Sequence, residues 1–161
     1  MAGREVTSGA KRLLVLRHAK AEVGLGLADH ERPLAPRGRR DAVVMGDHLR
    51  AEGWEPDLVL CSTALRTRQT LEALGLSAPV RFERSIYTGD GQDLLTLVNL
   101  VEEECGSVLL VGHNPAVHEL VVTVGNEPVE DFPTCALGVI ELADWQARGG
   151  RLLDYRTPKT L

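Results

Sequence analysis

Three short, nearly continuous apolar runs constrain the fold of this chain most strongly. They are residues 13–16 (Leu-Leu-Val-Leu), 57–61 (Asp-Leu-Val-Leu-Cys) and 107–111 (Ser-Val-Leu-Leu-Val). A strand with apolar side chains on both faces is typical of a parallel sheet that helices cover on both sides. The runs therefore predict buried parallel strands, and residues 80–83 are a shorter candidate for a fourth.

Helical patterns separate these strands, since apolar residues recur there every three or four positions. The predicted helices are 36–52, 64–74, 93–104 and 115–124, with Ser62 or Thr63 as an N-terminal cap and Gly75 as a stop. Residues 136–142 and 151–156, around Gly149 and Gly150, favour two further strands in a hairpin at the sheet edge. The alternation predicts an α/β fold of three layers, a mostly parallel sheet with helices on both faces.

Length and composition indicate an ordinary globular protein. The 161 residues fit one domain, 1–161, in which residues 1–11 are expected to form a loose N-terminal tail. The net charge of −5 argues against a nucleic-acid partner, and no apolar run is long enough for a signal peptide or a membrane span. The three cysteines form no Cys-x-x-Cys pair and fit neither a disulfide framework nor a zinc site. We therefore expect a cytoplasmic protein with no nucleic-acid or membrane partner.

Polar side chains follow the predicted strands at the edge where ligands gather in such sheets. They are Arg17 and His18 after the first strand, Ser62, Thr63 and Arg66 after the second, and His113 and Asn114 after the strand that ends at Val111. Guanidinium groups offer fixed pairs of donors to phosphate oxygens, and an imidazole can attack phosphorus or pass a proton near neutral pH. Two of each predict a phosphoryl-transfer site that needs no metal and no cofactor.

Four ordered motifs carry a family resemblance. They are Arg17-His18-Ala19-Lys20, Asp29-His30-Glu31-Arg32-Pro33-Leu34 with Gly38, Ser62 to Thr70 (Ser-Thr-Ala-Leu-Arg-Thr-Arg-Gln-Thr), and Gly112-His113-Asn114-Pro115. Together they resemble the histidine phosphatase superfamily, and most of all its short SixA-type phosphohistidine phosphatases. The resemblance implies a phosphoglycerate-mutase-like fold. It also implies that His18 is the nucleophile, transiently phosphorylated, and that Arg17, Arg66 and His113 hold the phosphate.

Further roles are expected around this core. The second ring nitrogen of His18 should donate to a backbone carbonyl, which would fix the tautomer. The resemblance places Arg32 near the pocket, where it could bind substrate, although it also belongs to a run of arginines that could simply be a solvated helix face. Ser62 could bind phosphate or cap a helix. Asn114 is expected to bind substrate and to cap the helix that Pro115 opens, which would aim the positive end of that helix at the site.

The chain departs from ester-cleaving members of the family in one respect. The resemblance leads us to look for a carboxylic acid after the third strand, but that segment reads Ser85-Ile-Tyr-Thr-Gly-Asp90, so only Asp90 or Asp93 could serve. An alkoxide leaving group needs such an acid, whereas imidazole has a pKa of about 6.5 and leaves more readily. The departure favours a phosphohistidine substrate, on a phosphorelay or phosphocarrier domain. The short chain also predicts a shallow, open pocket.

Other functions remain to be weighed. A general ester phosphatase of the same family is the main alternative, and a domain that binds phosphohistidine without hydrolysing it is another. A cysteine phosphatase needs an arginine six residues after its cysteine, but Arg66 lies only five residues after Cys61. A metal-dependent hydrolase is disfavoured because no His-x-His or His-Glu-x-x-His pattern occurs.

Overall fold

A six-stranded sheet forms the middle of the molecule. The structure, a computed structural model, describes residues 9–161. The strands are β1 (Lys11–Arg17), β2 (Leu58–Ser62), β3 (Val80–Glu83), β4 (Ser107–Gly112), β5 (Leu137–Leu142) and β6 (Arg151–Arg156), in the spatial order β3-β2-β4-β1-β5-β6. β1 to β4 run parallel, and β5 and β6 form an antiparallel hairpin in which β6 is the edge strand. The predicted mostly parallel sheet and its edge hairpin are confirmed.

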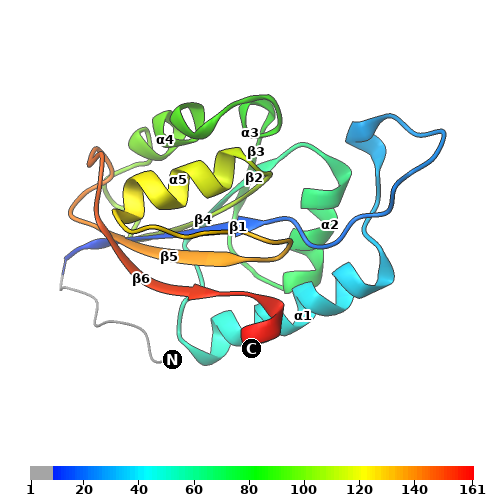
Figure 1. The fold of residues 1–161 in the computed structure, drawn as a ribbon. Coiled ribbons are helices and arrows are strands. Elements are labelled where there is room, and N and C mark those ends of the chain that lie inside the picture. The colour runs from blue at the N-terminus through cyan, green and yellow to red at the C-terminus, as the bar shows by residue number, and fades with distance from the viewer. Residues whose placement is uncertain (1–8) are drawn as a thin grey trace.

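Helices cover both faces of the sheet, as Figure 1 shows. They are α1 (Pro36–Ala51), α2 (Leu65–Leu74), α3 (Arg84–Thr88), α4 (Gly91–Asn99) and α5 (Ala116–Gly125), and the short 3-10 helices are η1 (Asp29–Glu31) and η2 (Pro158–Thr160). Alternate residues of β1 serve two cores, since Leu14 packs with α1 and α2 whereas Leu13 packs with α4 and α5. The three-layer α/β fold is the one that the apolar runs predict.

Several boundaries differ from the predicted ones. α4 begins at Gly91 and ends at Asn99, instead of covering 93–104. Its early end has a physical reason, because Glu102, Glu103 and Glu104 would crowd negative charge at the negative end of the helix dipole. The helix α3 was not predicted. Its five residues are too few to give a periodic signal.

The N-terminus also differs from expectation. β1 begins at Lys11, which pairs with Leu142 of β5, so the last residue of the expected tail belongs to the sheet. Most of that expected tail, residues 1–8, lies outside the described residues. Within residues 9–161 no helix is long and apolar enough to cross a membrane.

Candidate active site

The sheet register brings the two predicted histidines together. Arg17 at the end of β1 pairs with Gly112 at the end of β4, so the next residues, His18 and His113, are neighbours. Their ring centroids are 5.3 Å apart, and the backbone N–H of His18 donates to the Gly112 carbonyl at 3.0 Å. Parallel strands place their carboxyl ends at one edge, which is why two residues so distant in sequence share a site.

His18 has one ring nitrogen engaged and one free to react. Nδ1 donates to the Ala19 carbonyl at 2.8 Å, and since a carbonyl only accepts, Nδ1 carries the proton. The expected backbone contact is thereby confirmed, and Nε2 keeps its lone pair. Burial lowers the pKa of His18 to about 4, and the nearby positive charges of Arg66, Arg17 and Arg32 also lower it. His18, with 8% of its surface exposed, is therefore neutral near pH 7.

His113 lies against Ser62. Its Nε2 shares a hydrogen bond of 2.7 Å with Ser62 Oγ, and its buried Nδ1 has no partner among the described residues. Burial first, and then the neighbouring His18 and Arg66, lower the pKa of His113 to about 3. An anion placed beside both rings would reverse these effects, because it stabilises the protonated form. Such an anion would therefore make His113 easier to protonate.

Two arginines approach the histidines. Arg17 Nη1 donates to the Phe132 carbonyl at 3.2 Å, and its buried Nε has no partner among the described residues. Burial and the charge of Arg66 lower the pKa of Arg17 from its ordinary value. The side chain of Arg66 is 9% exposed and comes from the second residue of α2. Buried like charges and an unpaired buried donor indicate a site for an anion.

Two of the expected helix caps are wrong, because α2 and α5 each begin one residue later than predicted, so that Ala64 and Pro115 occupy the N-cap positions. Neither Ser62 nor Thr63 caps α2, whose N-cap is Ala64, and Ser62 Oγ instead accepts from Ala64 N–H at 3.2 Å and contacts His113. Asn114 does not cap α5 either. Its Nδ2 donates to the Phe132 carbonyl at 2.8 Å, while the His113 carbonyl accepts from the first turn of α5.

Arg32 and Asp29 form the outer part of the site. Arg32 Nε donates to the Glu22 carbonyl at 2.9 Å and its Nη1 to Asp29 Oδ1 at 3.0 Å. Arg66 donates twice to the same residue, from Nη1 to the Asp29 carbonyl at 2.8 Å and from Nη2 to Oδ2 at 3.0 Å. Asp29 therefore connects the two arginines.

Sequence reasoning missed Asp29 and Tyr87 as site residues. The Tyr87 hydroxyl donates to Asp29 Oδ2 at 2.8 Å, and its ring lies edge-on to His113 with the centroids 5.6 Å apart. This bond first, followed by those from Arg32 and Arg66, holds the pKa of Asp29 well below its usual range. Asp29 belongs to the second sequence motif and Tyr87 to the segment in which an acid was sought. Nothing local in either segment marks the two residues as partners.

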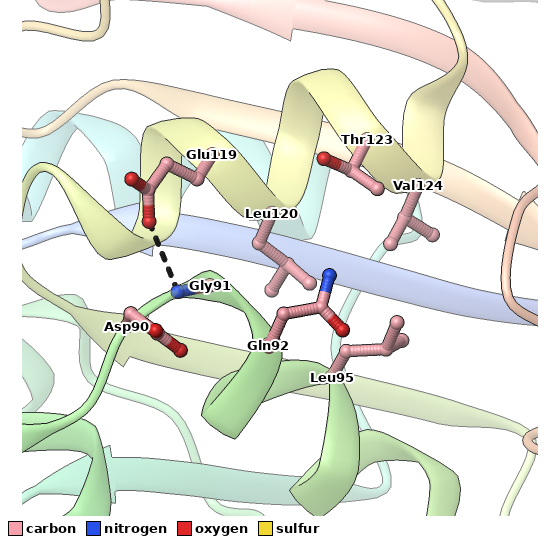
Figure 2. Close-up of a pocket in the computed structure, with 8 residues that line it drawn as sticks. All are labelled: Asp90, Gly91, Gln92, Leu95, Glu119, Leu120, Thr123 and Val124. Carbon is pink, nitrogen blue, oxygen red and sulfur yellow. Dashed lines mark hydrogen bonds between the residues drawn. The ribbon is translucent and has the colours of Figure 1, made fainter.

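Asp90 and Asp93 are committed to the start of α4. Each carboxylate accepts from the backbone N–H of the other, in a reciprocal capping box. Figure 2 shows Asp90 beside a hollow of about 280 Å³ between α4 and α5, where Glu119 Oε1 accepts from Gly91 N–H at 3.0 Å. None of the residues that line this hollow belongs to the histidine-arginine cluster.

Cys61 belongs to the core that packs against α1 and α2. Cys61 is fully buried, and this burial raises the pKa of its thiol to about 12, far from that of a reactive thiolate. Over residues 9–161, no three histidine, cysteine or acidic side chains are grouped so that they could hold a metal ion.

Comparisons with known proteins agree with the geometry. Residues 13–86 match the histidine phosphatase superfamily (branch 1). The chain belongs to the histidine phosphatase superfamily, and both its fold and its relatives support a phosphatase, a hydrolase of phosphate groups.

Similar proteins include phosphohistidine phosphatases. The phosphohistidine phosphatase SixA of Escherichia coli is 30% identical over 138 residues, which are 81% of this chain and 85% of that protein. A structure from Nakamurella multipartitia, provisionally assigned as a phosphohistidine phosphatase SixA, is 32% identical in sequence and has a TM-score of 0.87. The match covers 94% of this chain and 98% of the Nakamurella chain. The structure of the protein histidine phosphatase SixA complexed with tungstate is 28% identical in sequence and has a TM-score of 0.82. The match covers 92% of this chain and 97% of that one.

Proposed function

We propose that the protein removes phosphate from phosphohistidine on another protein, without a metal, through a phosphorylated His18. The observation that carries this proposal is a neutral His18 with a free Nε2 among Arg17, Arg66 and His113. Of the acids that could protonate an ester oxygen, Asp29 is held ionised by its hydrogen bonds, and Asp90 and Asp93 cap α4. The SixA names of its relatives point to the same substrate.

The mechanism has two displacements at phosphorus. Nε2 of His18 attacks, the bond from phosphorus to the substrate nitrogen breaks, and the electron pair of that bond stays on the leaving nitrogen. Arg17, Arg66 and His113 hold the phosphoryl oxygens during the transfer. Water then attacks phosphorus, the pair of the P–Nε2 bond returns to Nε2, and the proton of the water passes to a phosphate oxygen.

Phospho-His18 needs no separate acid for the second displacement. Its Nδ1 keeps its proton, since Nδ1 donates to the Ala19 carbonyl. The ring therefore leaves phosphorus as a neutral imidazole. Ser62 positions His113 through the hydrogen bond between them. Asn114 and Arg17 both donate to the Phe132 carbonyl, and this shared acceptor holds Arg17 in place.

A phosphoprotein partner is supported by the surface next to the site. The segment between β1 and η1 exposes three large apolar side chains, Val23 (76%), Leu25 (92%) and Leu27 (51%). It is joined to the site through Arg32, which bonds both Glu22 and Asp29. Exposed apolar groups gathered beside a site are typical of protein interaction surfaces.

The test compares the rate of phosphate release from a phosphohistidine-bearing protein with that from a phosphoserine peptide, both with chelator present. We expect a clear preference for phosphohistidine, with the chelator having no effect. Equal or faster release from the ester would assign the site to a general phosphatase, and loss of activity with chelator would contradict the metal-free mechanism.

A further inference from the structure

Three side chains lie on the more exposed side of the histidine-arginine cluster, which we call its rim: Asp29, His30 and Tyr87. The side chain of Asp29 is 52% exposed and that of His30 is 33% exposed, whereas that of Arg66, which Asp29 contacts, is 9% exposed. The Tyr87 ring contacts two other rings of the site, with its centroid 5.6 Å from that of His113 and 4.8 Å from that of His30. If the proposed function holds, a phosphoryl group bound among His18, Arg17 and Arg66 keeps its leaving group on the solvent side, where this rim lies.

The Asp29 carboxylate has room for one more donor. A carboxylate has about four acceptor positions on its two oxygens. Oδ2 accepts from Tyr87 and Arg66, while Oδ1 accepts from Arg32 alone among the described residues. One position on Oδ1 is therefore available, on a half-exposed carboxylate that stays ionised.

A phosphohistidine substrate needs such an acceptor. Its phosphorylated ring leaves as neutral imidazole only if the other ring nitrogen carries a proton during the transfer; otherwise it must leave as an anion. The protein meets the same need for its own phospho-His18 through the Ala19 carbonyl, which binds Nδ1–H. An ionised acceptor at the rim would hold the proton on the substrate ring in the same way. It would hold it more tightly, because a charge-assisted hydrogen bond is stronger than a neutral one.

We propose that Asp29, His30 and Tyr87 form a subsite for the leaving imidazole of phosphohistidine, in which Asp29 Oδ1 accepts a hydrogen bond from the ring nitrogen that does not carry phosphorus. This inference rests on the proposed function and names the group that selects its substrate. In the transfer, the P–N bond breaks, its electron pair stays on the nitrogen that bore phosphorus, and the proton on the other nitrogen remains there, bound to Asp29. The Tyr87 and His30 rings provide aromatic surface beside the cationic ring.

The test measures kcat/KM of Asp29→Asn on two substrates, a peptide that carries one phosphohistidine and p-nitrophenyl phosphate. The aryl ester has no N–H to offer, and its phenolate leaves without a proton. We expect kcat/KM to fall about 10- to 100-fold more for phosphohistidine than for the ester, the effect of losing one charge-assisted hydrogen bond to the leaving ring. Weaker support of Arg66 lowers both rates by the same factor, so the ratio of the two rates isolates the subsite. Tyr87→Phe, which removes one of the bonds that orient Asp29, should give a smaller loss with the same selectivity.

Glu55→Gln is the matched control, because it makes the same change of carboxylate to amide at an exposed position before β2, at the end of that strand away from the site, and should leave both rates unchanged. An equal loss on both substrates would overturn the subsite, since a residue that only holds Arg66 in place affects every phosphate alike. A wild-type protein that hydrolyses the ester but not the phosphohistidine peptide would instead contradict the proposed function itself.

Discussion

At the scale of single residues, a hydrogen bond and the surrounding charge decide which atom of His18 can react. The Ala19 carbonyl fixes the proton on Nδ1, and burial together with the positive charge of three arginines keeps Nε2 unprotonated. Arg66 is itself held by two bonds to Asp29. His18 and its charged surroundings are therefore oriented in the free protein. Preorganisation of this kind is how enzymes lower the cost of reorganisation during a reaction.

Replacing His18 should therefore remove the reaction. We expect His18→Ala to lower kcat by about 10³-fold or more on a phosphohistidine peptide, because the variant lacks the proposed nucleophile. Rapid quenching followed by intact-mass measurement should detect one phosphoryl group on the wild-type protein and none on the variant. His48→Gln, on α1 against Trp54, is the control and should behave as wild type. Wild-type turnover by His18→Ala would rule out the two-step mechanism.

At the scale of elements, the close packing of α1 on α2 supports the site. Gly46 of α1 faces the backbone of Leu74 at the end of α2, and Arg66 stands near the start of the same helix. A second glycine of α1, Gly38, faces the backbone of Lys20 just after the His18-Ala19 pair. Side chains at either position would push α1 away from elements that carry site residues.

Gly46→Ala tests this packing, because two effects oppose each other. Helix propensity favours alanine over glycine by about 1 kcal/mol. However, a Cβ at Gly46 would overlap the Leu74 carbonyl oxygen, and such overpacking costs about 1–3 kcal/mol. We expect the free energy of unfolding to fall by about 1 kcal/mol in urea titrations. The control, Val43→Ala on the exposed side of α1, should change the free energy of unfolding by no more than about 0.5 kcal/mol. A Gly46→Ala variant more stable than wild type would mean that α1 and α2 can move apart at little cost.

At the scale of the whole molecule, a buried cationic site lies inside an acidic protein. The net charge is −5, yet Arg17 and Arg66 stand beside two buried histidines. Bulk charge therefore does little to attract phosphate, and short-range donors must do so instead. Burying His18 and His113 in their neutral forms has a cost that depends on pH, because these histidines bind protons near pH 6.5 when the chain unfolds.

Acid should weaken the fold for this reason. Between pH 6.5 and about 4, His18 and His113 bind protons in the unfolded chain but not in the folded protein. Acid therefore favours the unfolded chain, and the contribution of these histidines to stability, which is fully present above pH 6.5, is lost as the pH falls. We expect the free energy of unfolding to drop on the order of a few kcal/mol across this range in urea titrations. The double variant His18→Asn/His113→Asn should flatten the dependence, and an unchanged slope would contradict its assignment to these residues.

The sequence by itself determined the architecture and the position of the site along it. Continuous apolar runs mark strands that are buried on both faces, and the carboxyl ends of parallel strands share one edge. These two rules suffice to bring Arg17, His18 and His113 to the same edge from sequence positions far apart. They work because they depend on periodicity and chain direction, which are local properties of the sequence.

Only the tertiary structure decided which polar groups bond to one another. Ser62 contacts His113 instead of capping a helix, Asn114 binds the Phe132 carbonyl, and Tyr87 reaches Asp29 across 58 positions of sequence. Each of these side chains has several partners compatible with its local pattern. The choice among them depends on which groups the packed helices and loops bring within about 3 Å, and no local pattern encodes that distance.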